Sequence, residues 1–439
     1  MSRFFHALMM HGYRSAIEVA AVFGNAKARA WLDMRKGNLE RIQLATAALS
    51  SGEKWVWFHC ASVGEFEQAQ PVMKSLREND ESLRFLLTFY SPSGWHSFAN
   101  RKPSWWRNSD ASAAMPLDTS TEVRNFLNAM TPVGASAPAV QLLALAKYEV
   151  WPVLIHEIKK HAPVALFAGH VIPGRWPFRA MGGFHREAWR NLSKVLVQSE
   201  SSVAELRRWD IAAEKAGDPR FDRVLDSVAM VHAQPNKGLQ DWVGKRPCLV
   251  VGSAWEAESR IAQAAWSLGM ACIVVPHEWD ARWAKQQQLA WKKCGATAIV
   301  WSELHDETLS AESDASFPQS DVVLLDAMGQ LMHAYGVGQL ALVGGGFGKG
   351  VHNTLEPAAH GLAIWTGPKV GRFAEVRGLM DCGALETAQS EVGCAEALST
   401  AWGNSELLKK RGLAARQYAQ RNAGAGPQIA AQLSKMLDR

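Results

Sequence analysis

Short apolar runs alternate with longer amphipathic stretches along most of the chain. The apolar runs of the first half lie at residues 55–61, 84–89, 141–146, 162–168 and 194–198, and a helical pattern over 66–79 follows the first of them. Strands that alternate with helices are typical of a parallel sheet covered by helices on both faces. The first half therefore predicts an α/β domain built on a doubly wound parallel sheet.

The second half repeats this pattern after an interruption. Proline and glycine residues between Asp222 and Pro247 break the periodicity, and apolar runs return at 248–252, 271–276, 298–301, 322–325, 340–344 and 363–367. We therefore predict two Rossmann-like domains that face a cleft, over residues 1–222 and 223–415, and a C-terminal helix over 416–439. Ligands of such sheets bind at the carboxyl ends of the strands, so the cleft is the expected site.

Composition narrows the class of protein. The chain has 439 residues, of which 48% are hydrophobic and 20% charged, and its net charge is +5. These values fit a soluble globular protein and disfavour general binding to nucleic acid. The six cysteines are scattered without a CxxC pair, which is typical of reduced core residues in a cytoplasmic protein and indicates no metal site.

The N-terminal segment is apolar but interrupted. Residues 4–23 contain many large apolar side chains, yet His6, His11, Arg14 and Glu18 stand among them. No apolar run reaches the roughly 20 residues that span a bilayer, and no signal-peptide cleavage site follows. The segment is either an amphipathic helix that lies on a membrane or a plain core helix.

Residues 344–357 (GGGFGKGVHNTLEP) follow a short apolar strand and lead into a predicted helix over 355–360. Glycines let backbone N–H groups approach an oxyanion, and the helix would direct its positive end to the same space. Glu356 could accept hydrogen bonds from ribose hydroxyls, and His352 and Asn353 could donate at the rim. The GxxxxGK[ST] and GxGxxG patterns do not fit here. The alternative is an ordinary strand-to-helix turn with a capping Asn353 and a dipole-stabilising Glu356.

A second turn, at residues 59–67 (HCASVGEFE), carries Glu65 at the start of a helix. A general base needs a carboxylate on a rigid mount, which this position provides. The alternative is a glutamate that only balances the helix dipole.

Four further motifs lie at the ends of strands or in turns. Glu149 lies in KYEVWP at 147–152, beside aromatic residues, and could orient substrate. Arg220 in GDPRFD at 217–222 could neutralise a leaving phosphate or could be an ordinary turn arginine. VPHE at 275–278 and DAMGQL at 326–331 could frame a base or phosphate, although each is weak by itself.

Together and in this order, the motifs resemble those of the 3-deoxy-D-manno-octulosonic acid (Kdo) transferases, which attach Kdo from CMP-Kdo to the lipid A precursor. The resemblance runs from about Trp55 to Glu386 and includes SVGE, YEVWP, VQSE, GDPRFD, VGSAWEAE, VPHE, MGQL and HNTLEPAAHG. It implies a GT-B fold, an inverting mechanism without a metal ion, no cofactor besides the donor CMP-Kdo, and work at the cytoplasmic side of the inner membrane.

The resemblance also implies roles for individual residues. Glu65 resembles the catalytic base, and Glu149 and Arg220 match positions that stabilise the transition state. The positions that match CMP-binding residues are Pro276, His277, Met328, Gly329, Gln330, Asn353, Thr354, Leu355 and Glu356. The chain departs from the best-known members, which carry Lys at the place of Arg220, Arg at that of His277 and Glu at that of Gln330.

The reaction that follows is a direct displacement. Glu65 would take the proton of an acceptor hydroxyl, while Arg220, helix N-termini and the turn after Val343 would hold the departing phosphate. Arg175, Trp176, Arg179 and Arg186 are candidates for contact with the phosphorylated lipid and the membrane. The alternatives are another GT-B nucleotide-sugar enzyme, such as a UDP-dependent transferase or an epimerase, and an inactive envelope-binding scaffold.

Overall fold

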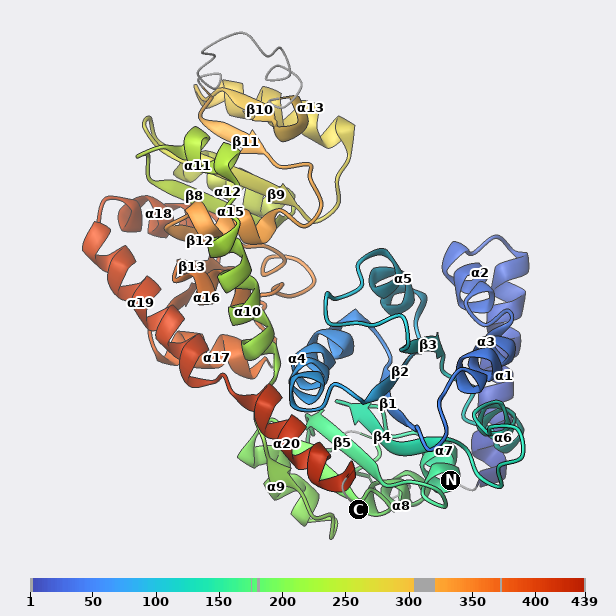
Figure 1. Cartoon of the computed structure of the whole chain (residues 1–439). Helices are drawn as coiled ribbons and strands as arrows, with labels where there is room; N and C mark the ends of the chain where they lie inside the picture. Colours follow the sequence, from blue (N-terminus) through green and yellow to red (C-terminus); the bar gives the residue numbers. More distant parts are fainter. Residues whose placement is uncertain (1–2, 175, 180–181, 304–319, 372, 438–439) are drawn as a thin grey trace. The chain divides into compact units, whose positions relative to one another are not determined.

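The protein folds into two α/β units, each of which is described by itself. The computed structural model describes residues 3–174, 176–179, 182–303, 320–371 and 373–437. Unit 1 contains the residues up to Arg223 together with those from Ala423 onward, and unit 2 is formed by Val224–Asn422 (Figure 1). The predicted α/β fold with two Rossmann-like parallel sheets is confirmed.

Unit 1 is built on a sheet of seven parallel strands in the order β3-β2-β1-β4-β5-β6-β7. The strands are β1 (Trp55–Cys60), β2 (Arg84–Phe89), β3 (Ala111–Ala114), β4 (Val140–Ala146), β5 (Val164–Gly169), β6 (Lys194–Val197) and β7 (Glu214–Lys215). The sequence predicted five of them to within two residues. It missed β3 and β7, the two edge strands, because ASAA and EK carry no run of large apolar side chains.

Alternate residues of these strands enter two different cores. Trp55 and Trp57 of β1 pack on one face with the α6 and α7 helices, whereas Val56 and Phe58 pack on the other with α4 and α20. Strands buried on both faces explain why the sequence shows continuous apolar runs there. The helices of unit 1 are α1 (Arg3–Val22), α2 (Ala26–Asp33), α3 (Asn38–Ala47), α4 (Val63–Asn79), α5 (Pro92–Asn100), α6 (Ser120–Ala129), α7 (Pro152–Ile158), α8 (Gly183–Arg190), α9 (Glu200–Arg207) and α20 (Ala425–Leu437).

The first helix is not a core helix. Of its residues only His6 and Ala21 are buried, while large apolar side chains, among them Phe4, Leu8 and Val19, are exposed. His6 ties it to the unit, since its Nε2 lies 2.8 Å from the buried carboxylate of Asp118. In the described part of the chain, no helix is both long and apolar enough to cross a bilayer.

Unit 2 contains a second sheet of seven parallel strands, in the order β10-β11-β9-β8-β12-β13-β14. The strands are β8 (Cys248–Ala254), β9 (Ala271–Pro276), β10 (Ala298–Val300), β11 (Val322–Leu324), β12 (Leu340–Val343), β13 (Ala363–Thr366) and β14 (Leu385–Thr387). The sequence predicted all of them except β14. Its helices, besides α10 (Arg220–Ala233), are α11 (Lys237–Val243), α12 (Glu256–Ala265), α13 (Ala281–Lys293), α15 (Leu331–Val337), α16 (Leu355–His360), α17 (Ala374–Asp381), α18 (Glu391–Trp402) and α19 (Ser405–Arg421).

Two segments differ from the sequence-based expectation. The α10 helix (Arg220–Ala233) and α11 occupy most of residues 222–247, where proline and glycine suggested a broken linker. The proline and glycines fall at the ends of these helices, which is where such residues are tolerated. The C-terminal helix expected over 416–439 starts later: α19 continues to Arg421, and Gly424, in the Gly/Ala-rich break that precedes the terminal helix, turns the chain with φ +98° before α20 begins.

The α20 helix belongs to the core of unit 1. Ile429 and Leu433 are fully buried against the α4 side of the sheet. Asp222 anchors the turn before it by accepting hydrogen bonds from the amides of Gly424 (2.6 Å) and Gly426 (3.0 Å). Gly426 is required there, since a Cβ would lie 2.7 Å from the side chain of Pro71.

Candidate functional site

In unit 1 the strand order reverses between β1 and β4, and both predicted carboxylates lie next to this point. The chain leaves β1 toward β2 and β3 on one side, and continues from β4 toward β7 on the other. Such a reversal opens a crevice at the carboxyl ends of the strands, where ligands of open α/β sheets bind. Glu65 follows β1 and Glu149 follows β4. Both carboxylates lie close enough to Cys60 to raise the pKa of its buried thiol further, after burial itself as the main cause.

Glu65 lies in the first turn of α4. The turn starts at Ser62, whose extended backbone makes it the N-cap, and its hydroxyl donates to the carboxylate of Glu65. The side chain is half-buried, so it is accessible to a ligand. A carboxylate on the first turn of a 17-residue helix is held on a rigid element and stabilised by the helix dipole.

Glu149 is held by neighbours on both sides. Trp151 donates its indole N–H to Oε2 of Glu149 at 2.8 Å, and Nε2 of His59 lies 3.5 Å from the same oxygen. The imidazole of His59 is itself fixed, since Nδ1 lies 3.0 Å from the hydroxyl of Thr88. The Glu149 side chain is only 12% exposed. The sequence analysis did not identify His59 and Thr88. His59 could have been found, because it is a polar residue within a strand of otherwise apolar residues.

Aromatic side chains pack against the ring of Trp151. Tyr90 stacks on Trp151 with ring centroids 5.0 Å apart, and the guanidinium of Arg35 lies 5.1 Å from the Tyr90 ring. Arg35 also lies 3.4 Å from the Trp31 ring and donates to the carbonyl oxygens of Trp31 and Tyr90. Burial lowers the pKa of Arg35 to about 10, so the group remains charged at pH 7. This layer connects α2 to the carboxylate of Glu149.

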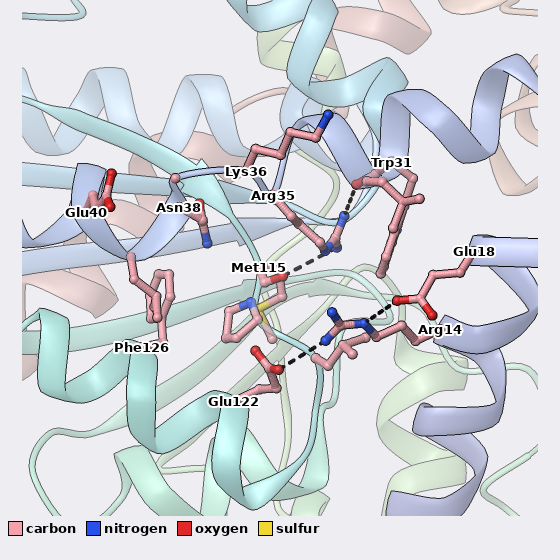
Figure 2. Close-up of a pocket in the computed structure, with 15 residues that line it drawn as sticks. Arg14, Glu18, Trp31, Arg35, Lys36, Asn38, Glu40, Met115, Glu122 and Phe126 are labelled. Atoms are coloured by element: carbon pink, nitrogen blue, oxygen red, sulfur yellow. Dashed lines mark hydrogen bonds and ion pairs between the residues drawn. The ribbon is translucent and has the colours of Figure 1, made fainter. Parts of the chain in front are cut away.

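A cavity of about 590 Å³ lies beside this layer, among the N-terminal helices (Figure 2). Its walls carry three basic side chains and three acidic ones, which are Arg14, Arg35, Lys36, Glu18, Glu40 and Glu122. Arg14 is paired with Glu18 at 2.9 Å and with Glu122 at 3.3 Å. Because these charges balance, the cavity offers no net charge to a phosphate. None of the predicted site residues lines it.

Arg220 begins α10 and is paired within its own turn. Its Nη2 lies 2.7 Å from Oδ2 of Asp218, and its amide donates to Oδ1 of the same residue. Gln68 of α4 contacts Asp218 at 3.4 Å, one turn after Glu65. Arg220 therefore lies near the Glu65 helix, with 27% of its side chain exposed, and Asp218 reduces the charge that it can offer.

Two of the basic residues proposed for lipid contact bind backbone carbonyl groups. Arg179 donates to the carbonyl oxygen of Gly174 at 2.6 Å, and Arg186 donates to that of Pro177 at 3.0 Å. Arg175 lies outside the described residues.

In unit 2 the predicted donor-binding residues gather at one edge of the second sheet. The strands β11, β9, β8 and β12 are neighbours, and the order reverses between β8 and β12. Pro276 ends β9, Gln330 precedes α15 after β11, and Asn353 precedes α16 after β12. The predicted helix over 355–360 is confirmed as α16. All these residues follow the carboxyl ends of parallel strands, where a nucleotide would bind.

The polar members of this set contact each other or their neighbours. Asn353 accepts from the amide of Leu355 (2.9 Å) and donates to Glu356 (3.0 Å). Gln330 accepts from Asn236 at 3.1 Å. Thr354 is buried and its hydroxyl has no hydrogen-bond partner among the described residues. The Asn353 contacts fit a capping role.

Two further members, Met328 and Gly329, lie at the surface. Met328 is fully exposed, and Gly329 has the left-handed φ of +80°. They place an accessible turn between β11 and α15.

His277 is the middle ring of a stack that the sequence did not predict. Its centroid lies 4.5 Å from Trp255 and 4.5 Å from His352, and the planes differ by 26° and 25°. Trp255 donates its indole N–H to Nε2 of His352 at 3.1 Å. Burial and His277 lower the pKa of His352. Trp255 follows β8 directly, so its position in VGSAWEAE is the signal that could have identified it.

The expected role of the glycine-rich turn needs correction. Its Gly345 amide donates to Oε1 of Glu258 at 3.0 Å, and Glu258 also accepts from the amide of Trp255 at 3.1 Å. An internal carboxylate thus occupies a donor that was expected to hold a phosphate. Burial raises the pKa of Glu258, which is 1% exposed.

Close packing explains two of these glycines. A Cβ at position 344 would lie 2.0 Å from the carbonyl oxygen of Ser253, and one at 346 would lie 2.4 Å from the amide nitrogen of Gly367. The turn therefore needs glycine where it crosses the ends of β8 and β13.

Comparison with known proteins gives one family. Residues 36–223 match the family described as 3-deoxy-D-manno-octulosonic-acid transferase (kdotransferase). The Kdo transferase of Haemophilus influenzae is 24% identical over 398 residues, which are 88% of this chain and 87% of the relative. That of Bordetella pertussis is 27% identical over 73% of this chain and 72% of its own length. The resemblance drawn from the sequence is confirmed.

Solved structures support the fold alone. A glycosyltransferase from Rickettsia africae is 9% identical with a TM-score of 0.51, and covers 88% of this chain and 98% of its own. An Anabaena protein in complex with UDP is 11% identical with a TM-score of 0.53, and covers 87% of this chain and all of its own. Both alignments extend across the two units.

Proposed function

From the similarity of this chain to the Kdo transferases, we propose that it transfers Kdo from CMP-Kdo to the lipid A precursor of lipopolysaccharide. The observation that carries the proposal is the pair Glu65 and Glu149 beside the strand-order reversal of unit 1. One carboxylate is half-buried on a helix start, and the other accepts a hydrogen bond from Trp151 and lies 3.5 Å from Nε2 of His59. A proton acceptor and a fixed charge are what a displacement at an anomeric carbon requires.

Glu65 acts as the general base. It takes the proton of an acceptor hydroxyl as the oxygen forms a bond to the anomeric carbon of Kdo. The bond from that carbon to the phosphate oxygen breaks, and CMP leaves with the electron pair, so the configuration inverts. General-base catalysis contributes about 100- to 10,000-fold to the rate.

Glu149 and Arg220 stabilise the charge that develops. Glu149 is acceptor-only when ionised, and its fixed position suits the positive character of the sugar ring in the transition state. The guanidinium of Arg220 neutralises the negative charge on the departing phosphate. A metal ion is not needed for that purpose. Its pairing with Asp218 must loosen for this role.

The donor is held by the edge of the second sheet. Pro276, His277, Gln330 and the loop before α16 lie at the carboxyl ends of β9, β11 and β12, along the same edge as the reversal between β8 and β12, which supports a nucleotide site there. His277 stacks within a ladder of three rings and replaces the arginine of the best-known relatives. An imidazole offers fewer N–H donors to a phosphate than a guanidinium does.

The acceptor is a membrane lipid, so the enzyme works at the cytoplasmic face of the inner membrane. Support comes from α1, on which Phe4, Phe5 and Leu8 are exposed and which also carries Arg3 and Arg14, each paired with a glutamate. Apolar and basic side chains on one helix favour the surface of an anionic membrane.

A single experiment separates the candidate functions. The protein is incubated with a lipid A precursor and either CMP-Kdo or UDP-sugars, and the lipid mass is measured. Mass increments of Kdo support the proposal. Turnover only with UDP-sugars would identify another GT-B enzyme, and no turnover with any donor would identify a scaffold.

The base is tested by substitution. Glu65→Ala should lower transfer at least 100-fold while the folded state and CMP binding persist. Glu78→Ala, which removes an exposed carboxylate from the same helix, is the matched control and should retain activity. Full activity of Glu65→Ala would remove Glu65 from its role.

A further inference from the structure

A second cavity of unit 1, which we call the β4–β5 cavity, lies next to Glu149. Its volume is about 310 Å³, and it is lined by Tyr148, Val150, His170, Val171, Ile172, Trp176, Pro177, Phe178, His185 and Trp189. Tyr148 and Val150 are the two residues that flank Glu149, and His170 to Ile172 follow the neighbouring strand β5. The cavity therefore lies at the same sheet edge as the proposed reaction.

The lining is aromatic and aliphatic, and it carries no charge. None of the lining side chains is acidic, lysine or arginine. Burial and the nearby His6 lower the pKa of His185 to about 4, so its ring is neutral at pH 7. The ring packs against Trp176 with centroids 5.2 Å apart. A charged or strongly hydrated ligand would lose its hydration there without compensation.

The size of the cavity suits one alkyl chain and not a whole glycolipid. A volume of 310 Å³ has room for roughly ten groups of the size of a water molecule or a methylene. Ligand cavities of this size lie at the lower end of the usual range. A nucleotide or a disaccharide would need many hydrogen-bonding groups, and the lining offers only a few, on Tyr148, His170 and His185.

One of these polar side chains has a nitrogen atom without a partner among the described residues, although that atom is itself buried. Nδ1 of His185 is buried and has no hydrogen-bond partner in the described part of the chain. A neutral imidazole can donate to a carbonyl oxygen or accept from a hydroxyl group. An acyl chain provides both an apolar body and such an oxygen at its ester or amide end.

We propose that the β4–β5 cavity holds one acyl chain of the lipid acceptor and so places the reacting hydroxyl beside the Glu149 edge. This inference rests on the proposed function for the identity of the acceptor. Burial of each methylene favours binding, so the cavity supplies binding energy from a part of the substrate that does not react.

The test fills the cavity. Ile172→Trp places a larger side chain on its wall, and Ile172→Ala is the matched control that leaves it open. With CMP-Kdo, each variant is assayed on an acylated acceptor and on the same sugar phosphate without acyl chains. Ile172→Trp should lower kcat/KM for the acylated acceptor by about tenfold or more, which is the effect of losing about two buried methylenes. Its activity on the deacylated acceptor should stay within about twofold of the wild type.

A direct binding measurement separates this inference from the proposed function. A fluorescent fatty acid with an eleven-carbon chain, roughly the capacity of the cavity, is titrated into each protein. We expect at least tenfold weaker binding by Ile172→Trp than by Ile172→Ala, with circular dichroism and Tm close to those of the wild type. This result supports binding of an acyl chain in the β4–β5 cavity, even if the protein transfers no sugar from any donor.

Three outcomes would overturn the inference. The first is equal affinity of the wild type, Ile172→Trp and Ile172→Ala for the fatty acid, which would place the acyl chain elsewhere. The second is an equal loss of Ile172→Trp activity on both acceptors. The third is unchanged activity of Ile172→Trp on the acylated acceptor. If Ile172→Trp does not fold, Val171→Phe replaces it from the adjacent position of the wall.

Discussion

Removal of Glu258 should loosen the glycine-rich turn of unit 2. Its carboxylate accepts hydrogen bonds from Trp255 at 3.1 Å and from Gly345 at 3.0 Å, and so connects the start of α12 to the turn after β12. The side chain is almost fully buried. Glu258→Ala would leave these amides without an acceptor in a space that water barely reaches.

The magnitude follows from two opposing terms. Hydrogen bonds to a charged acceptor contribute about 1.5–3 kcal/mol each, so two contribute about 3–6 kcal/mol. The variant also removes a buried charge, whose desolvation cost offsets part of this sum. We expect a net decrease of about 2–4 kcal/mol in the free energy of unfolding of unit 2.

The dependence on pH has a definite sign. Burial raises the pKa of Glu258 in the folded state above its unfolded value. Its contribution to stability is therefore largest below the unfolded pKa and decreases as the pH rises through the folded pKa. The stability difference between the wild type and Glu258→Ala should be larger at pH 4 than at pH 7.

The measurement is urea denaturation at both pH values, with hydrogen exchange of the β8 and β12 amides to identify the transition of unit 2. Glu256→Ala, on the same helix and exposed, is the control and should change the unfolding free energy by less than about 0.5 kcal/mol. A similarly small effect of Glu258→Ala, or a difference that grows toward pH 7, would refute the reasoning.

Three further predictions concern other contacts. Trp151→Phe keeps a ring against Tyr90 but removes the donor to Glu149, so kcat should decrease about tenfold while Tm changes little; an unchanged kcat would contradict the positioning of Glu149 by this bond. Asp222→Ala leaves two amides of the α20 turn without an acceptor, and hydrogen exchange should become faster in α20 than in α4; equal protection would argue against this anchor. Gly346→Ala should destabilise unit 2 by at least about 2 kcal/mol in thermal unfolding, whereas Gly348→Ala should have little effect, because its Cβ would lie 3.7 Å from the nearest atom, the carbonyl oxygen of Gly345.

Much of the fold could be predicted because its strands are buried on both faces. A run such as Trp55–Cys60 is apolar except for His59, and it can be recognised without knowledge of its neighbours. The missed strands β3, β7 and β14 lie at sheet edges, where only part of a strand needs apolar side chains. Their pairing depends on the strand beside them, which no local pattern contains.

The site was predicted less completely, because its geometry depends on contacts between distant segments. The sequence identified Glu65 and Glu149 as candidates from the turns that carry them. It could not show that Trp151 and His59 contact Glu149, or that Glu258 binds the turn 87 residues later. A glycine-rich turn looks the same in sequence whether its amides face a ligand or a carboxylate of the protein.

The return of α20 to the first unit affects the order of folding during synthesis. Residues 425–433 complete the core beneath α4, yet the ribosome makes them only after all of residues 224–422. Until then, the apolar side of α4 and β1 lacks its cover and exposes surface that chaperones recognise and that can aggregate. The second unit has no such delay, so in the cell it can mature while the first still waits for its last helix.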